Sequence, residues 1–426
     1  MKKLLVLTAL LFVFYASYAQ TGIWSGKLDV YGTKITLVFH LEDDACTMDS
    51  PDQGVKGIPA QLERTPIGVK VTVPSINASY EGLYAIKTIT GTFTQNGQQF
   101  PLSLVPGEPK RNRPQTPVGP FPYTTEEVSF TNGDAVLSGT LVLPEGFTKN
   151  TPVLLMVTGS GLQNRDEEIF EHKPFAVIAD ALARQGIATL RYDDRGFGKS
   201  TGDVINFTTE DLKNDALSGI SLLRNRFDKV GIIGHSEGGT IAFMLAAEGK
   251  VDFVVSLAGC VENGGEVLLK QNRSALAKAG LPEEIVDNYV SVLKNVFDEI
   301  KAGKTPVVAG TGLPEPLEKN LQDALPVLST PYMKYFIAMD VAPLLKNITC
   351  PVLALNGTLD SQVECGANLG IIRKEIISPK KVVEIEGVNH LFQHCTTGDV
   401  SEYKDIEETI APEVLQIIIE WLQGEK

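Results

Sequence analysis

One short segment in the second half of the chain has the pattern of a catalytic serine. The residues GHSEG at 234–238 follow an apolar run at 230–233 and precede a helical stretch at 240–247. Glycine two residues to either side of a serine, between a strand and a helix, is typical of a sharp, strained turn that raises the hydroxyl above the sheet. Ser236 is therefore the candidate nucleophile. The backbone N–H of Glu237, at the amino end of the helix, faces negative charge that develops there.

This chemistry requires a general base, because a serine hydroxyl alone is a weak nucleophile. His390 follows a predicted strand at 381–385, at the carboxyl end where functional loops of a parallel sheet gather. His394, four residues later, is the second choice. The three other histidines are less suitable: His40 lies in a β-rich region, His172 precedes a helix, and His235 is expected to point to the far face of the turn.

A carboxylate should orient the base, and Asp360 follows the predicted strand at 352–355 at its carboxyl end. The chain order Ser236, Asp360, His390 is the order typical of a serine on such a strand-to-helix turn. Taken alone, Asp360 would also suit a turn and His390 a loop. The agreement of three separate elements favours a catalytic triad.

Other residue patterns resemble functional motifs but do not meet the requirements of those motifs. The segment GFGKS at 196–200 is not a phosphate loop, because the required first glycine is replaced by Asp193. His390 and His394 have zinc-like spacing, but the residue between them that would be Glu is Leu391, and no third ligand is evident. Asp193 and Asp194 are adjacent, so they should point to opposite faces, and one is expected to form an ion pair or cap the next turn. We predict neither a cofactor nor a metal.

The elements that would position these residues alternate between apolar runs and amphipathic stretches. Strands are predicted at 153–157, 188–190, 230–233, 253–257, 352–355 and 382–385, with helices such as 175–184 and 209–226 between them. This alternation predicts an α/β fold with a mostly parallel, doubly wound sheet that helices cover on both faces.

About 90 residues between 259 and 350 interrupt this alternation, and their pattern is mostly helical, as at 266–277 and 283–300. A connection of this length is rarely plain loop. We interpret 262–345 as a helical lid over the carboxyl edge of the sheet, the alternative being an ordinary scaffold layer.

The part of the chain before the sheet differs in character. Residues 20–105 show short alternating stretches separated by turn signals such as Asn96-Gly97, which predict a small antiparallel, all-β domain. Residues 106–124 contain six prolines and no periodic pattern, which predicts an extended linker. The catalytic domain is then expected to span 125–426.

The amino terminus has the pattern of a signal peptide at 1–19, with two lysines, an apolar run too short to span a bilayer, and Ser17-Tyr18-Ala19 as the cleavage site. We expect an exported protein, periplasmic or secreted, without a membrane anchor.

The formal charge of −14 and the absence of a long basic run argue against nucleic-acid binding. Five cysteines are too few for a disulfide-built fold; Cys365 and Cys395 either pair or, as burial of free thiols favours, stay reduced.

The motif at 234–238, with Asp360 and His390 after it and YDDRGFGKS at 192–200, resembles the α/β-hydrolase family over about 300 residues. Within it, TGSG at 158–161 with NRD at 164–166 resembles exported bacterial serine esterases and acyl hydrolases, to which a similar N-terminal β domain is attached. The lipase-type His-Gly-Gly-Gly is missing. By position in this loop, the Ser160 backbone N–H is the expected second oxyanion donor, with Gly161 as the alternative.

The resemblance implies a serine hydrolase that cleaves a small-molecule carboxylic ester through an acyl-enzyme. A peptidase or amidase of the prolyl-aminopeptidase-like type, and a binding or scaffold protein with a vestigial hydrolase domain, are the alternatives. The sequence does not show the acyl group, the alcohol or the oligomeric state. Aromatic residues of the insert are expected either to line an apolar pocket or to pack the lid's own core: Tyr289, Phe297, Tyr332, Tyr335 and Phe336.

Overall fold

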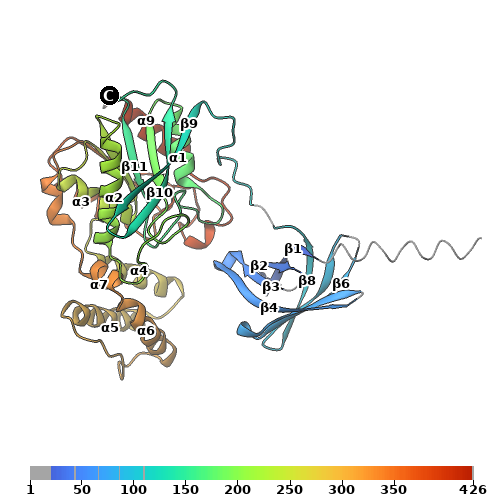
Figure 1. Cartoon of the computed structure of the whole chain (residues 1–426). Coiled ribbons are helices and arrows are strands. Elements are labelled where there is room, and N and C mark those ends of the chain that lie inside the picture. Colours follow the sequence, from blue (N-terminus) through green and yellow to red (C-terminus); the bar gives the residue numbers. More distant parts are fainter. Residues whose placement is uncertain (1–20, 43–44, 66, 86, 109–110, 425–426) are drawn as a thin grey trace, which may run out of the picture. The chain divides into compact units, whose positions relative to one another are not determined.

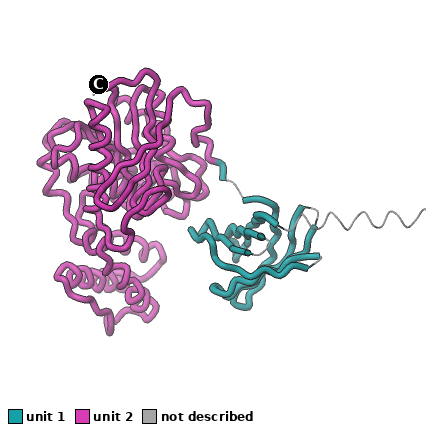
Figure 2. The backbone as a smooth tube through the Cα atoms, viewed as in Figure 1, with its two compact units in different colours: residues 1–112 teal, residues 113–426 magenta. Residues whose placement is uncertain are grey.

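Two compact units make up the chain, residues 1–112 and 113–426 (Figures 1 and 2). The predicted signal peptide at 1–19 lies outside the residues that the structure describes. Among the described residues, no helix is both long and apolar enough to cross a membrane. The computed structural model describes residues 21–42, 45–65, 67–85, 87–108 and 111–424.

The first unit is a closed antiparallel barrel of eight strands within residues 22–106. Each strand pairs with the next, and the last returns to pair with the first. At the Asn96-Gly97 turn both residues have positive φ, 50° and 82°, as a tight hairpin requires. The predicted all-β domain is confirmed. Its strands are β1 (Gly22–Val30), β2 (Thr33–Leu41), β3 (Cys46–Ser50), β4 (Val55–Thr65), β5 (Gly68–Val73), β6 (Ala78–Tyr84), β7 (Ile89–Gln95) and β8 (Gln98–Pro106).

The second unit is built on an eight-stranded sheet with the order β16-β15-β14-β13-β11-β12-β10-β9. Strands β11 to β16 run parallel to one another, whereas β10 is antiparallel to both β9 and β12. The strands are β9 (Tyr123–Asn132), β10 (Ala135–Pro144), β11 (Val153–Val157), β12 (Ala188–Tyr192), β13 (Val230–His235), β14 (Val254–Leu257), β15 (Val352–Gly357) and β16 (Lys380–Ile385).

Helices cover both faces of this sheet, and each face has its own core. Neighbouring residues of β13 point to opposite cores: Ile232 packs with α2, α3 and α8, and Ile233 packs with α1 and α9. Both residues are fully buried, which explains the continuous apolar pattern of the strand. The predicted doubly wound, mostly parallel fold is therefore confirmed. The helices are α1 (Pro174–Ala183), α2 (Thr209–Arg224), α3 (Glu237–Ala247), α8 (Cys365–Glu375) and α9 (Pro412–Gly424).

Four helices fill the long connection between β14 and β15, and we call residues 264–338 the helical insert. They are α4 (Gly264–Lys278), α5 (Glu283–Lys301), α6 (Glu315–Leu328) and α7 (Pro331–Ala338). Tyr289 and Phe297 belong to a separate apolar cluster of the insert itself. Phe336 instead packs with the core of the sheet. The insert thus has a small core of its own and is anchored to the sheet through α7.

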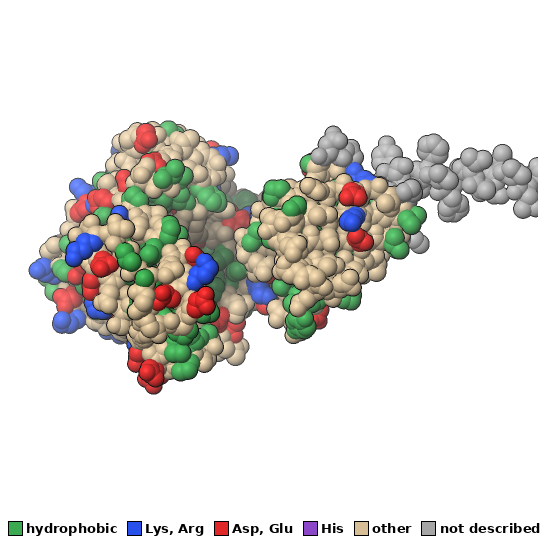
Figure 3. Space-filling view, turned by 90° about the horizontal axis from the view of Figure 1, so that it is seen from below, with side chains coloured by type: hydrophobic (Ala, Val, Ile, Leu, Met, Phe, Trp, Pro, Cys, Tyr) green, Lys and Arg blue, Asp and Glu red, His purple; other side chains and the backbone are tan. Residues whose placement is uncertain are grey.

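Charged side chains of both signs are interspersed over the visible face of the second unit in Figure 3. No large area of that face carries only Lys and Arg. The visible face therefore shows no extended basic surface of the kind that nucleic-acid backbones require.

The turn between β13 and α3 brings two backbone segments unusually close together. A Cβ on Gly234 would lie 2.0 Å from the Gly238 carbonyl oxygen, and a Cβ on Gly238 would lie 2.1 Å from the Val157 carbonyl oxygen. Both partners are backbone atoms of packed elements, so they have little freedom to move aside. Glycine at these two positions is what allows α3 to start directly above the end of the sheet.

We predict that Gly238→Ala destabilises the second unit by about 1 to 3 kcal/mol, because the added methyl group overlaps the backbone of β11. Thermal unfolding would measure the loss. The matched control is Gly370→Ala in α8, where an added Cβ meets nothing within 4 Å; it should leave stability unchanged or raise it by about 0.5 to 1 kcal/mol. Equal effects of the two substitutions would contradict the steric account.

Candidate active site

Ser236 occupies the turn between β13 and α3 in a strained conformation. Its φ is 53° and its ψ is −117°, a region that residues with a side chain rarely adopt. Ser236 is partly exposed and lines a cavity of about 350 Å³. The strain turns the serine side chain away from the core and into this cavity.

His390 and Asp360 form a buried pair at the same cavity. Asp360 Oδ2 lies 2.7 Å from His390 Nδ1, and the two side chains are 0% and 4% exposed. The other oxygen, Oδ1, accepts the backbone N–H groups of Gln362 and Val363 at 2.8 and 2.9 Å, which fixes the carboxylate. With Nδ1 committed to Asp360, Nε2 is the ring atom available to act as a base. His390 and Ser236 line one cavity, so the structure brings all three predicted residues to one place.

The second-choice histidine, His394, is not among the residues lining this cavity. Its ring is about half exposed and pairs with Glu408 and Glu413, each at 2.9 Å. His394 therefore belongs to the surface of the second unit.

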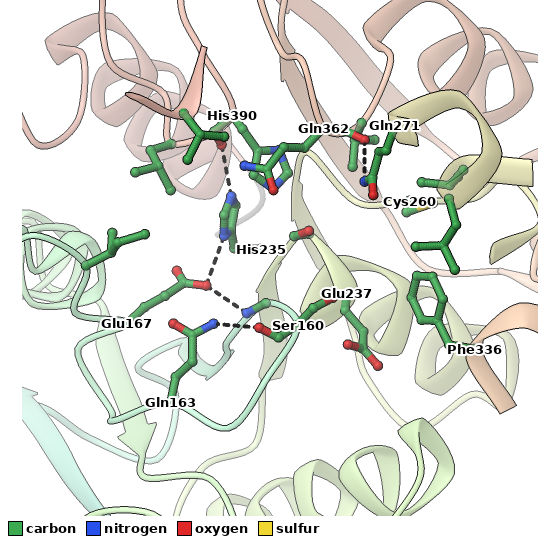
Figure 4. Close-up of a pocket in the computed structure, with 18 of the residues that line it drawn as sticks. Ser160, Gln163, Glu167, His235, Glu237, Cys260, Gln271, Phe336, Gln362 and His390 are labelled. Atoms are coloured by element: carbon green, nitrogen blue, oxygen red, sulfur yellow. Dashed lines mark hydrogen bonds and ion pairs between the residues drawn. The ribbon is translucent and has the colours of Figure 1, made fainter. Parts of the chain in front are cut away.

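The His235 ring lines the same cavity as Ser236, which corrects the expectation that it points to the far face of the turn. Its Nδ1 is 2.9 Å from Glu167 Oε1, and its Nε2 is 2.9 Å from the His390 carbonyl oxygen (Figure 4). Burial lowers the pKa of His235, but the Glu167 carboxylate outweighs it, and the net pKa is raised. A protonated ring donates from both nitrogens, which suits one carboxylate and one carbonyl. His235 therefore holds the backbone of the His390 loop.

Glu167 is a residue that the sequence analysis missed. Its buried carboxylate accepts the Gly159 backbone N–H at 2.7 Å with the same oxygen that faces His235. A Cβ on Gly159 would lie 3.2 Å from Ser236 Cβ, so this loop passes directly over Ser236. Glu167 thus connects the loop over Ser236 to the histidine that supports His390. In the sequence it stands in an acidic run at 166–168 that carries no sign of this role.

The two expected oxyanion donors also meet at this cavity. Glu237 is the first residue of α3, so its N–H lies at the positive end of that helix. Ser160 follows Gly159 in the loop over Ser236 and lines the cavity. The alternative donor, Gly161, is not among the lining residues, and its N–H lies next to the Tyr332 hydroxyl. The arrangement favours Ser160 over Gly161.

The Glu237 side chain has a second role that the sequence did not suggest. Its buried carboxyl accepts the Thr209 hydroxyl at 2.6 Å and the hydroxyl of Tyr332 from α7. Burial raises the pKa of Glu237, which favours the neutral form. The carboxyl therefore ties the helical insert to the first turn of α3.

The remaining wall of the cavity is mostly apolar and comes largely from the insert. Val267, Leu268, Met333 and Phe336 line it beside Tyr332. Gln271 of α4 donates to the Gln362 carbonyl at 2.9 Å, so the insert contacts the loop that carries Asp360 (Figure 4). Of the five aromatic residues considered, Tyr332 and Phe336 reach the cavity, whereas Tyr335 bonds to Glu210 at 3.0 Å.

Two other expectations concern residues near the site. Asp193 pairs with Arg165 at 2.9 Å and accepts the Lys199 N–H at 3.1 Å, which confirms the predicted ion pair and turn cap. Asp194 turns to the other side and is buried against Thr158.

The thiols of Cys365 and Cys395 are free. In the described part of the chain, no group of three or more His, Cys, Asp or Glu side chains is arranged to hold a metal ion.

Comparison with known proteins now identifies the family. Residues 140–357, about half of the chain, match the family model described as the alpha/beta hydrolase fold. The chain belongs to the alpha/beta hydrolase family. Its site at the carboxyl ends of β13, β15 and β16 is where members of a doubly wound fold place their functional loops.

Individual proteins that this hydrolase resembles share 30% sequence identity or less with it. Esterase EstD from Thermotoga maritima is 29% identical over 279 residues, which are 64% of this chain and 61% of the esterase. An acyl transferase from Photobacterium leiognathi is 30% identical over 115 residues, 26% of this chain and 38% of the transferase. The hydrolase thus spans less than two thirds of these relatives. Among solved structures, Est1E from Butyrivibrio proteoclasticus has a TM-score of 0.43 at 17% identity, over 70% of this chain and 98% of Est1E.

We predict that Asp360→Asn lowers kcat by about 10³- to 10⁴-fold while the protein stays folded, because the amide favours the wrong ring tautomer of His390. Initial rates on an activated ester, with thermal unfolding beside them, would measure both effects. Glu408→Gln is the matched control, since it removes another carboxylate that lies 2.9 Å from a histidine Nδ1. A comparable loss of activity in the control would contradict the assignment of Asp360.

Proposed function

We propose that this hydrolase cleaves carboxylic esters through a covalent acyl-enzyme on Ser236. The observation that carries the proposal is the His390–Asp360 pair at the same cavity as a serine held at positive φ. The likeness to an esterase of Thermotoga maritima supports the choice of ester over other acyl substrates.

In the proposed reaction, His390 Nε2 takes the proton of Ser236 as the serine oxygen attacks the ester carbonyl carbon. The carbonyl oxygen becomes an oxyanion, which the backbone N–H groups of Glu237 and Ser160 stabilise. Protonated His390 then gives its proton to the leaving alcohol as the C–O bond breaks. A water molecule, activated by the same histidine, hydrolyses the acyl-serine and restores the enzyme.

The cavity also indicates the kind of substrate. A volume of about 350 Å³ is at the small end of ligand pockets and suits a short or medium acyl group. Its wall is apolar on the side of the insert, and no Lys or Arg stands among its described lining residues. We therefore propose an uncharged ester, since the His235 ring is already paired with Glu167 and a second substrate carboxylate would lose hydration there without gaining a free cation.

We predict that the parent protein releases p-nitrophenol from short and medium acyl esters and that Ser236→Ala reduces this release to background. An aminoacyl-anilide panel distinguishes the peptidase alternative, because an amidase would turn over the anilides and leave the esters intact. His394→Asn is the control and should keep parental activity, because the His394 ring is about half exposed and does not line the cavity. Ester release that survives in Ser236→Ala would contradict the proposed nucleophile.

We further predict that kcat of the parent decreases as the pH rises through the pKa of Glu237, because its carboxyl then ionises beside the oxyanion position. The pKa of Glu237 is raised by burial, so its carboxyl is neutral below that pKa and charged above it. A negative charge close to the oxyanion raises the barrier. Glu237→Gln removes this charge and should reduce this decrease in kcat. Identical pH profiles for the two proteins would contradict this role.

A further inference from the structure

The interior of the barrel is packed in one half and hollow in the other. In the packed half, the rings of Phe39 and Tyr80 stack with centroids 5.5 Å apart. The buried Tyr80 hydroxyl donates to the Ile89 carbonyl at 2.8 Å, and Trp24 and Leu104 are buried in the same cluster. This half is an ordinary hydrophobic core.

The other half encloses a cavity of about 500 Å³. Its deepest lining residues are apolar and almost fully buried: Leu28, Leu37, Met48 and Phe93 are 2 to 4% exposed. Further apolar side chains form its walls, namely Val30, Ile35, Val55, Ile58, Ile76 and Phe100. Protein interiors pack densely, and their voids are few and seldom larger than a water molecule. A hollow of this size is therefore not a packing defect.

The cavity opens where four chain connections of the barrel meet. Its lining residues cluster around the connections at 31–32, 51–54, 74–77 and 96–97, which all lie at the same end of the antiparallel strands. At the first of these, Tyr31 has φ 52° and is 82% exposed. Its ring packs edge-on against the Phe100 ring at 5.9 Å. An aromatic residue at positive φ in a tight turn is uncommon, and here it places an apolar ring at the cavity mouth.

The polar residues that line the cavity are uncharged, and Asp52 of the 51–54 connection is paired with Arg111 outside the lining. Ser50, Gln53, Gln95, Asn96 and Gln98 line the cavity with hydroxyl and amide groups, and its described lining includes no Lys, Arg, His, Asp or Glu. Such groups can bond a hydroxyl or an ester, whereas a carboxylate would be desolvated without a partner cation. Eight-stranded barrels are just wide enough to hold one small ligand.

We infer that the barrel is a binding site for one uncharged aliphatic molecule with a hydroxyl or ester end, its hydrocarbon part in the hollow and its polar end at the amide-lined mouth. The volume lies within the range of small-molecule sites. The inference rests on the barrel alone and does not depend on the proposed esterase activity.

Fluorescence titration of the purified full chain with the uncharged probe N-phenyl-1-naphthylamine tests this inference. Ile35→Trp fills the hollow from its wall and should weaken probe binding at least tenfold. Lys34→Trp adds the same ring one residue earlier on the outer, exposed face and should bind like the parent. Ester hydrolysis should be equal in both variants, which separates this site from the cavity at Ser236.

Competition identifies the ligand chemistry. Dodecan-1-ol should displace the probe, and dodecanoate at the same concentration should displace at least tenfold less. If thermal unfolding shows that Ile35→Trp is misfolded, Ile58→Trp with Lys56→Trp as its outer-face control provides the same comparison. Equal probe affinity in the inner and outer variants, or equal competition by alcohol and carboxylate, would overturn the inference.

Discussion

The close backbone contact between the end of β13, the start of α3 and the end of β11 constrains everything around it. Gly234 and Gly238 permit an approach that no side chain would allow, and Ser236 between them is held at positive φ. The conformational cost of that residue is of the order of 1 to 3 kcal/mol, which the packed sheet and helix must offset. In return, the hydroxyl and the amino end of α3 face the same cavity.

A continuous set of hydrogen bonds holds the surrounding loops against this turn. Gly159, over Ser236, donates to Glu167; Glu167 faces His235; and His235 bonds to the His390 backbone. Two loops that are far apart in sequence are thereby fixed relative to this turn. The insert joins from the other side, where Tyr332 donates to the carboxyl of Glu237. A buried pair of charged side chains therefore holds one side of the site, and hydrogen bonds from hydroxyl groups hold the side that faces the insert.

Local residue patterns and the order of the elements along the chain were enough to predict several features of the structure. The doubly wound sheet, the helical insert, the all-β domain and the turn at Ser236 each follow from periodicity or from glycine spacing, which act within a few residues. The sequence did not predict Glu167, the side chain of Glu237 or the closure of the β domain into a barrel. These features depend on contacts between segments that are distant in sequence, such as the pairing of β1 with β8. An acidic residue or an alternating strand pattern does not indicate which distant segment it will contact. His235 was misplaced for the same reason, since its ring is oriented by Glu167.

Covalent labelling of the parent protein tests the central claim most directly. A diethyl p-nitrophenyl phosphate inhibitor should transfer its phosphoryl group to one residue, and mass spectrometry of the peptides should place the adduct on Ser236 with stoichiometric loss of ester hydrolysis. Asp360→Asn should be labelled far more slowly at the same residue, because His390 would no longer activate it. Labelling elsewhere, or full ester hydrolysis by a protein labelled at Ser236, would contradict the account.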